Sequence, residues 1–296
     1  MRRPLRKVAL TLLSIGGLLT LGAAPAVADG PSGEVQQTVR VVGNGSSVWI
    51  DHSHIQSGSI RFAVSTTNPQ TQDGGGSSVS LFRLNPGVSL DRFREDLADE
   101  FDQHPKAAAD GTQDLTRDVH VVGLADVVPG HPEVVTENVA PGTYYLMDLG
   151  NMAFTPALTT LHVRSAGPRI EQDSDLRSQV TATATSADRF IAPRNWPHEG
   201  TYTFKNASDT LHMMDIQRVR PGTTDQQITD FFNGTNPDVP FMPGPSGGND
   251  VTSPGVTLQV SYDLPPGTYV LLCFIADDQT GMPHASMGMH NVIVLH

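Results

Sequence analysis

The chain has 296 residues, of which 38% are hydrophobic and 17% charged, and its formal net charge is −12. The acidic excess opposes phosphate backbones and anionic lipid surfaces, so nucleic acid is excluded as a partner. A single cysteine excludes an internal disulfide framework and leaves a free thiol, an intermolecular bridge or a metal thiolate.

Residues 1–28 have the pattern of a cleaved secretory signal peptide. Four basic residues within 2–7 precede an apolar run over 8–21, and small residues at 26–28 favour cleavage after Ala28. The Arg-Arg pair inside the basic start keeps a twin-arginine route open. The run is shorter than the ~20 residues of a membrane-spanning helix. We therefore expect a secreted protein with no membrane insertion after cleavage.

Short apolar stretches, punctuated by 28 glycines and 22 prolines, follow the signal peptide. Residues 39–42, 59–64 and 256–262 alternate between apolar and polar side chains, which is typical of strands buried on one face. Evenly spaced short strands predict an all-β sandwich or barrel.

Four sequence blocks occur twice, in the same order. They pair 58–62 with 200–204, 80–87 with 215–222, 89–101 with 223–232, and 140–148 with 265–273. The repeat predicts two β-rich domains, 29–165 and 166–296, joined by a polar linker over 165–175. Each domain is expected to carry one short inserted helix, with Ser89 and Thr223 as the N-caps.

The two copies differ in the residues that can bind a metal. His212 aligns with Ser77, and Cys273 aligns with Asp148. The loop that follows Cys273 brings back a histidine and a methionine, which the first copy lacks at the corresponding place. Thiolate, imidazole and thioether are the ligands of trigonal copper sites with a weak axial methionine. Only the second copy therefore has a complete set.

The C-terminal half resembles the cupredoxins, the blue-copper β-sandwich domains. The matching residues are Asn206 ahead of His212, the strand 267–273 that ends in Cys273, and then His284 and Met289. The His284-to-Met289 spacing is similar to that of plastocyanins. The ten residues between Cys273 and His284 are more than plastocyanins have and nearer to copper nitrite reductases. The N-terminal half resembles this fold only through the repeat.

The resemblance implies two tandem cupredoxin-like Greek-key sandwiches, the first without metal ligands. It implies one type 1-like copper ion held by His212, Cys273 and His284, with Met289 as the axial ligand and Asn206 as a supporting residue. The function implied is electron transfer with a redox partner protein, or copper handling. We find no hydrolase, phosphate-loop or dinucleotide motif, so no enzymatic activity is expected from this chain alone.

Alternative interpretations remain open. Free cysteines are often small buried hydrophobic residues. If Cys273 is one of these, the chain is a metal-free secreted binding module. Met282 and Met287 could instead hold Cu(I) loosely in a carrier loop. His52 and His54 fit a surface metal site or, more simply, a solvated turn. The sequence leaves the oligomeric state undefined.

Overall fold

The computed structural model describes residues 37–69, 76–151, 156–166, 178–236 and 238–296. These residues belong to one unit, Gln36–His296, and the separate unit Met1–Val35 lies outside them. The expected signal peptide and most of the expected linker therefore fall outside the described residues. In the part of the chain that is described, no helix is long and apolar enough to span a bilayer.

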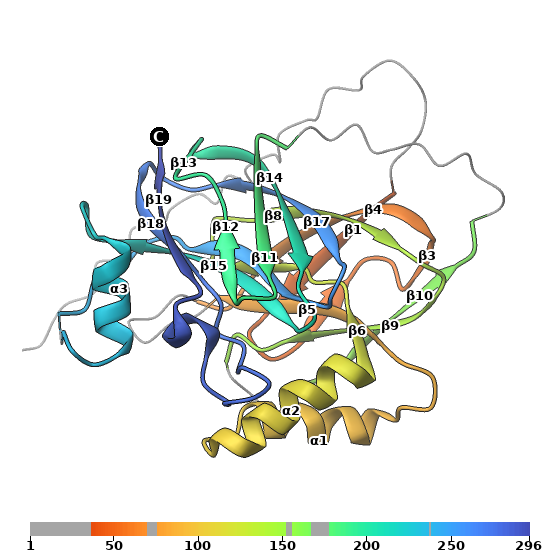
Figure 1. Cartoon of the computed structure of the whole chain (residues 1–296). Helices are drawn as coiled ribbons and strands as arrows, with labels where there is room; N and C mark the ends of the chain where they lie inside the picture. Colours follow the sequence, from red (N-terminus) through yellow and green to blue (C-terminus); the bar gives the residue numbers. More distant parts are fainter. Residues whose placement is uncertain (1–36, 70–75, 152–155, 167–177, 237) are drawn as a thin grey trace, which may run out of the picture. The chain divides into compact units, whose positions relative to one another are not determined.

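An eight-stranded sheet forms one layer of the fold (Figure 1). Its strands, in spatial order, are β12 Arg189–Ile191, β11 Val180–Thr185, β14 Glu199–Ala207, β17 Thr257–Asp263, β8 Glu133–Val139, β4 Gly58–Thr66, β1 Gln37–Gly43 and β2 Val48–Ile50. In β1, Val39 and Val41 are buried while Arg40 is exposed. This alternation fixes which face of the sheet turns toward the core.

A second sheet of eleven strands forms the other layer. Its main path, in spatial order, is β13 Asn195–Trp196, β19 His290–Leu295, β18 Gly267–Leu272, β15 His212–Val219, β16 Gly247–Thr252, β7 Ala125–Val127, β5 Ser77–Leu84, β9 Gly142–Asp148, β10 Thr159–Arg164 and β3 His54–Gln56. The strand β6 Val119–Val121 pairs with β5 beside this path.

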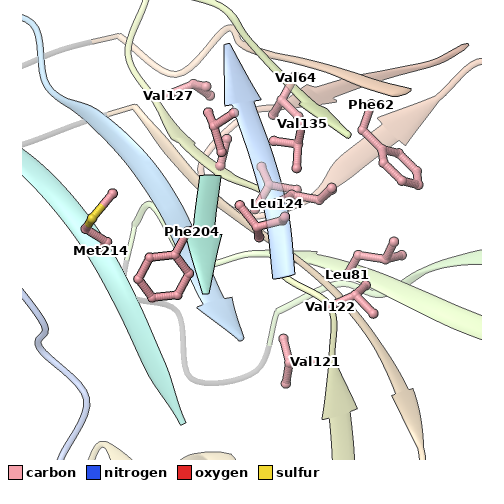
Figure 2. Packing of buried hydrophobic residues seen from close by; sticks show 14 of the residues in the cluster. Phe62, Val64, Leu81, Val121, Val122, Leu124, Val127, Val135, Phe204 and Met214 are labelled. Carbon is pink, nitrogen blue, oxygen red and sulfur yellow. The ribbon is translucent and has the colours of Figure 1, made fainter. Parts of the chain in front are cut away.

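The hydrophobic core contains side chains of both sheets. Figure 2 shows Phe62, Val135 and Phe204 of the first sheet near Leu81 and Met214 of the second, and all five are fully buried. Their cluster runs through both halves of the chain without interruption. The architecture is an all-β sandwich of two sheets around one core, as the sequence predicted.

In each sheet the strands of the C-terminal half and the corresponding strands of the N-terminal half follow the same order from the outer edge to the centre. In the first sheet, the parallel pair β11–β14 of the C-terminal half corresponds to the parallel pair β1–β4 of the N-terminal half. The halves meet where β17 pairs with β8 and β16 pairs with β7, both antiparallel. This order supports the proposed repeat, although the domain boundaries stay a prediction.

Three α-helices and one 3-10 turn connect strands in the described residues. They are α1 Leu90–Glu100, α2 Pro105–Asp118, α3 Asp225–Phe232 and η1 His284–Met287. Ser89 caps α1 by accepting from the backbone N–H of Arg92, which confirms the expected N-cap. The other expected cap, Thr223, is wrong. Thr224 caps α3 and exchanges hydrogen bonds with Gln227, because this register buries Ile228.

The helix α2 was not predicted, since one helix was expected in each half. Gly111 in its middle is a poor helix former. Here Gly111 lets α2 pass close to the end of α1, because a Cβ atom would come within 2.7 Å of the carbonyl carbon of Asp99. The helical pair α1–α2 has a role in the site described below.

Candidate metal centre

The sequence-predicted ligands gather at one end of the second sheet. His212 begins β15, and Cys273 directly follows the neighbouring antiparallel strand β18. Because Asp215 pairs with Leu272, the start of β15 and the end of β18 lie side by side at the same end of the sheet. His284 opens η1, and Met289 precedes β19. The fold thus brings His212, which is 61 positions from Cys273 in sequence, to the same end of the sheet as the other three residues.

The three strongest ligands converge closely. The Sγ atom of Cys273 lies 3.6 Å from Nδ1 of His212 and 3.5 Å from Nδ1 of His284, and all three residues are fully buried. An ion bonded to one thiolate and two imidazoles at roughly 2.0–2.3 Å in a trigonal plane would hold these atoms about 3.5–3.8 Å apart. The arrangement therefore fits one type 1-like copper ion.

Met289 completes the set from the loop that follows η1. Its side chain is fully buried and belongs to the same hydrophobic cluster as Cys273. Its backbone N–H donates to the carbonyl of His284 over 2.9 Å, which fixes the methionine relative to that ligand. Met289 stays the predicted axial ligand, since a thioether is the weak axial donor of trigonal copper sites.

The long interval between Cys273 and His284 does not separate them. The N–H of Ala285 donates to the carbonyl of Cys273 over 2.7 Å, and the N–H of His284 donates to the carbonyl of Ile275 over 3.0 Å. Residues 276–283 form an excursion that these two bonds close at its base. Despite the added length, Nδ1 of His284 lies 3.5 Å from the Cys273 sulfur.

The excursion 276–283 packs against the helical pair of the N-terminal half. Glu100 of α1 accepts from the N–H of Ala276 over 3.5 Å. Gln113 of α2 donates to the carbonyl of Asp278, and Gly281 lies against the carbonyl of Pro105. The N-terminal half therefore supports the ligand loop of the C-terminal half. The unusual length of the interval was the only sequence signal of this contact.

The Gly281→Ala variant tests this support. At Gly281 φ is +69°, and a Cβ atom would collide with the Pro105 carbonyl, whereas Gly234 has a φ of +67° with open space around it. Both substitutions incur about 1–2 kcal/mol for the left-handed backbone. We expect Gly281→Ala to destabilise the protein by a further ~1–3 kcal/mol in urea unfolding. Equal losses for both variants would contradict a tight contact between the excursion and α2.

Asn206 holds the turn that leads into His212. Its buried amide donates to the carbonyls of Thr210 and Thr252, each over 2.9 Å, and its oxygen accepts from the N–H of Ser208 over 3.1 Å. Thr252 in turn donates to the carbonyl of His212 over 3.0 Å. Asn206 thus holds the backbone next to His212, and its role as a supporting residue of a metal site stays a prediction.

Burial sets the protonation of the metal-free centre. It lowers the pKa of His212 to about 3, with the neighbouring His284 acting in the same direction. Burial also lowers the pKa of His284 to about 4, against the opposing charges of Asp277 and Asp278. It raises the pKa of the Cys273 thiol to about 12. At neutral pH both rings are therefore uncharged, and the thiol keeps its proton until a cation replaces it.

The corresponding place in the N-terminal half contains a hydrogen-bonded polar plug. Asp148, which aligns with Cys273, accepts from the N–H of Gly45 over 2.6 Å and from the N–H of Gly150 over 2.9 Å. The hydroxyl of Ser77, which aligns with His212, lies 2.6 Å from that of Thr66. Within the described residues, the groups of side chains suited to a metal ion all involve His284.

The weaker candidate ligands lie elsewhere. His52 and His54 are exposed, and the ring of His54 packs against His162 with centroids 4.9 Å apart. Met282 is 48% exposed, and the sulfur of Met287 accepts from the Thr280 hydroxyl over 3.5 Å. None of these residues belongs to the buried cluster of His212, Cys273 and His284.

One residue near the centre was missed by the sequence analysis. The carboxylate of Asp188 lies 3.8 Å from Nε2 of His212 and 3.7 Å from Nε2 of His284. Asp188 belongs to the turn between β11 and β12, and no spacing rule links it to the ligands. Burial and the charge of Asp277 raise its pKa, while Arg189 lowers it.

Comparisons with known proteins give distant similarities to solved structures, while no family model and no curated protein matches the chain. Reduced auracyanin from Roseiflexus castenholzii is 21% identical over 39% of this chain and 94% of its own, with a TM-score of 0.26. Copper nitrite reductase from Nitrosomonas europaea is 11% identical over 88% and 94%, with a TM-score of 0.21. A laccase from Pediococcus acidilactici is 9% identical over 88% and 60%, with a TM-score of 0.23.

Proposed function

We propose that this chain binds one copper ion through His212, Cys273, His284 and Met289 and transfers single electrons to or from a partner protein. The observation that carries the proposal is the position of two Nδ1 atoms within 3.6 Å of the Cys273 sulfur, with all three residues fully buried. A bound copper ion would supply a one-electron couple.

The protein's own residues define how such a centre works. Neutral imidazoles offer their Nδ1 lone pairs without first losing a proton. The backbone N–H groups of Met213 and Ile275 donate to the Cys273 sulfur and favour its anionic form. Since these donors also withdraw charge from the sulfur, they help to set the reduction potential.

Rigid attachment of the ligands supports electron transfer over loose copper carriage. His284 is fixed through the carbonyl of Ile275, and Met289 through the carbonyl of His284. Asn206 and Thr252 fix the approach to His212. Ligands held in this way move little when the charge of a bound ion changes, which favours fast electron exchange.

We further propose that the protein is exported, with residues 1–28 removed, and that it acts without catalysing a reaction itself. Cleavage would remove four basic and no acidic residues and leave 15 Lys and Arg against 31 Asp and Glu. Such an excess suits a basic redox partner. Residues 29–165 would form a metal-free domain that supports the ligand loop through α1 and α2.

Titration of the purified, reduced protein with Cu(II) tests the proposal. We expect one tightly bound copper per chain, an intense visible sulfur-to-copper band and the release of one proton from Cys273. A His54→Ala variant serves as the control, since the stoichiometry should not change. A colourless protein whose thiol stays protonated with and without copper would instead support the metal-free binding module, because the same Sγ–Nδ1 distances suit thiol hydrogen bonds.

A further inference from the structure

The outer edges of both histidines face a single carboxylate. In the proposed centre the Nδ1 atoms are used for the metal, so each ring carries its proton on Nε2. These Nε2 atoms are fully buried, and neither has a hydrogen-bond partner among the described residues. The Oδ1 atom of Asp188 lies 3.8 Å from one and 3.7 Å from the other.

Asp188 reaches this place through an unusual backbone conformation. It is the one non-glycine residue with positive φ in the described ranges, at 50°. Its N–H donates to the carbonyl of Thr185 over 2.9 Å, and its own carbonyl accepts from the Arg189 guanidinium over 2.7 Å. Aspartate tolerates left-handed geometry better than most residues, but the conformation still costs free energy. The hairpin turn therefore directs the carboxylate toward the two rings.

The neighbouring acidic residues do not occupy an equivalent position. The Oδ1 atom of Asp277 accepts from the N–H and the hydroxyl of Thr280, each over 2.6 Å, and its Oδ2 atom lies 4.0 Å from His284 alone. Asp209 is exposed. Among the carboxylates of the described residues, Asp188 alone has recorded contacts with both rings, at almost equal distances.

We propose that Asp188 is the positioning residue of this centre, an anionic cap that holds both imidazoles in the Nε2–H tautomer and shields their outer edges from water. This inference rests on the proposed copper function. At 3.7–3.8 Å the carboxylate is beyond direct hydrogen-bond range, so it acts through its charge. Carboxylates opposite the second nitrogen of a ligand histidine raise its basicity and orient the ring.

The N-terminal half shows the same hairpin used in a different way. There the turn between β1 and β2 contributes the N–H of Gly45 to Asp148, which occupies the position of Cys273. In both halves this turn covers the same end of the sandwich. In the N-terminal half the turn donates a hydrogen bond to the carboxylate of Asp148, and in the C-terminal half the turn itself contains the carboxylate of Asp188.

The metal-free protein offers a first test, which does not depend on copper. Long-range ¹H–¹⁵N spectra should show the proton on Nε2 in both His212 and His284, and Asp188→Ala should produce a mixture of tautomers. A wild-type protein with the proton on Nδ1 in either ring, or an Asp188→Ala spectrum identical to wild type, would overturn the proposal.

The copper-loaded protein offers a second test. An anion near the rings favours Cu(II), so Asp188→Asn should weaken Cu(II) relative to Cu(I) about tenfold, which raises the reduction potential by ~59 mV for one electron. Asp209→Asn removes the same charge from an exposed site and should change the potential much less, because solvent and salt screen it. Equal shifts in the two variants would refute the cap.

Two further outcomes distinguish a failure of the Asp188 proposal from a failure of the proposed copper function. A wild-type protein that binds no copper would sink the proposed function, while the tautomer test would still report on Asp188. Binding of a second equivalent of Zn²⁺ that disappears in Asp188→Asn would show that Asp188 is a metal ligand, and the cap proposal would then be wrong.

Discussion

The Cys273→Ser variant is expected to lose the intense visible absorption of the copper-loaded protein and to bind copper more than ~100-fold more weakly. A hydroxyl does not ionise at neutral pH and is a harder ligand than a thiolate. Loss of a residue that merely supports a ligand already costs 10–100-fold in metal affinity, and loss of the thiolate itself should exceed this. Because Cys273 is the sole cysteine of the chain, no other thiol can replace it.

Thermal unfolding provides a second measurement of the same substitution. Copper at about 1,000 times its Kd should stabilise the wild type by about 4 kcal/mol, which corresponds to a Tm increase of roughly 8 °C for a chain of this size. Cys273→Ser should show almost none of this increase while keeping a metal-free Tm close to the wild type. A variant that keeps the visible band or the full copper-dependent shift would show that the metal binds elsewhere.

The ligands were accessible from the sequence because the repeat supplied an internal comparison. His212 and Cys273 stand opposite Ser77 and Asp148, and the structure brings the first pair together while the second forms a polar plug. The strand pattern was equally readable, since alternation along β1, β4 and β17 reflects burial of one face.

Long-range contacts were not accessible from sequence. The docking of Glu100 on Ala276 joins residues that no local pattern relates. The position of Asp188 over the two histidines likewise depends on how one hairpin turn packs over the end of the neighbouring sheet. Such features arise from tertiary packing and leave no periodic or spacing signal.

Local ambiguity explains the error in the helix cap. Thr223 and Thr224 each have a glutamine three residues later, so both fit a capping box. The register is decided by burial of Ile228 against the core beneath α3. A capping motif alone could not make that choice.

Four carboxylates, three of them buried and that of Asp126 half-buried, lie near the line where the two halves join their sheets. Asp126, Glu133, Asp215 and Asp250 occupy β7, β8, β15 and β16. Burial raises the pKa of all four, and the charge of Asp250 raises that of Asp126 further. Ser78 donates to Asp250 over 3.2 Å, and the N–H of Gly248 donates to Glu133 over 3.2 Å. The cluster therefore holds protons that the unfolded chain would release.

The Asp215→Asn variant is expected to be more stable than the wild type by about 4 kcal/mol at pH 8 and close to it at pH 4. The pKa of Asp215 rises from 3.8 to about 7 on burial, and each unit is worth about 1.4 kcal/mol. Between pH 3.8 and 7 the native state keeps the Asp215 proton that the unfolded state has lost. The contribution of Asp215 to wild-type stability is therefore complete below pH 3.8 and is lost as the pH rises through 7. Asparagine carries no such ionisation and can still accept from Gln217.

Urea unfolding between pH 4 and pH 8 measures this difference, with Asp209→Asn as a control for the removal of one negative charge. The wild type and the control should lose stability in parallel as the pH rises, while Asp215→Asn should follow a flatter curve. Where β7 pairs with β16, ionised carboxylates of this cluster would have to move out of the core to reach water. This movement would separate the paired strands of the two halves. Parallel curves for all three proteins would show instead that Asp215 reaches solvent or a cation when it ionises.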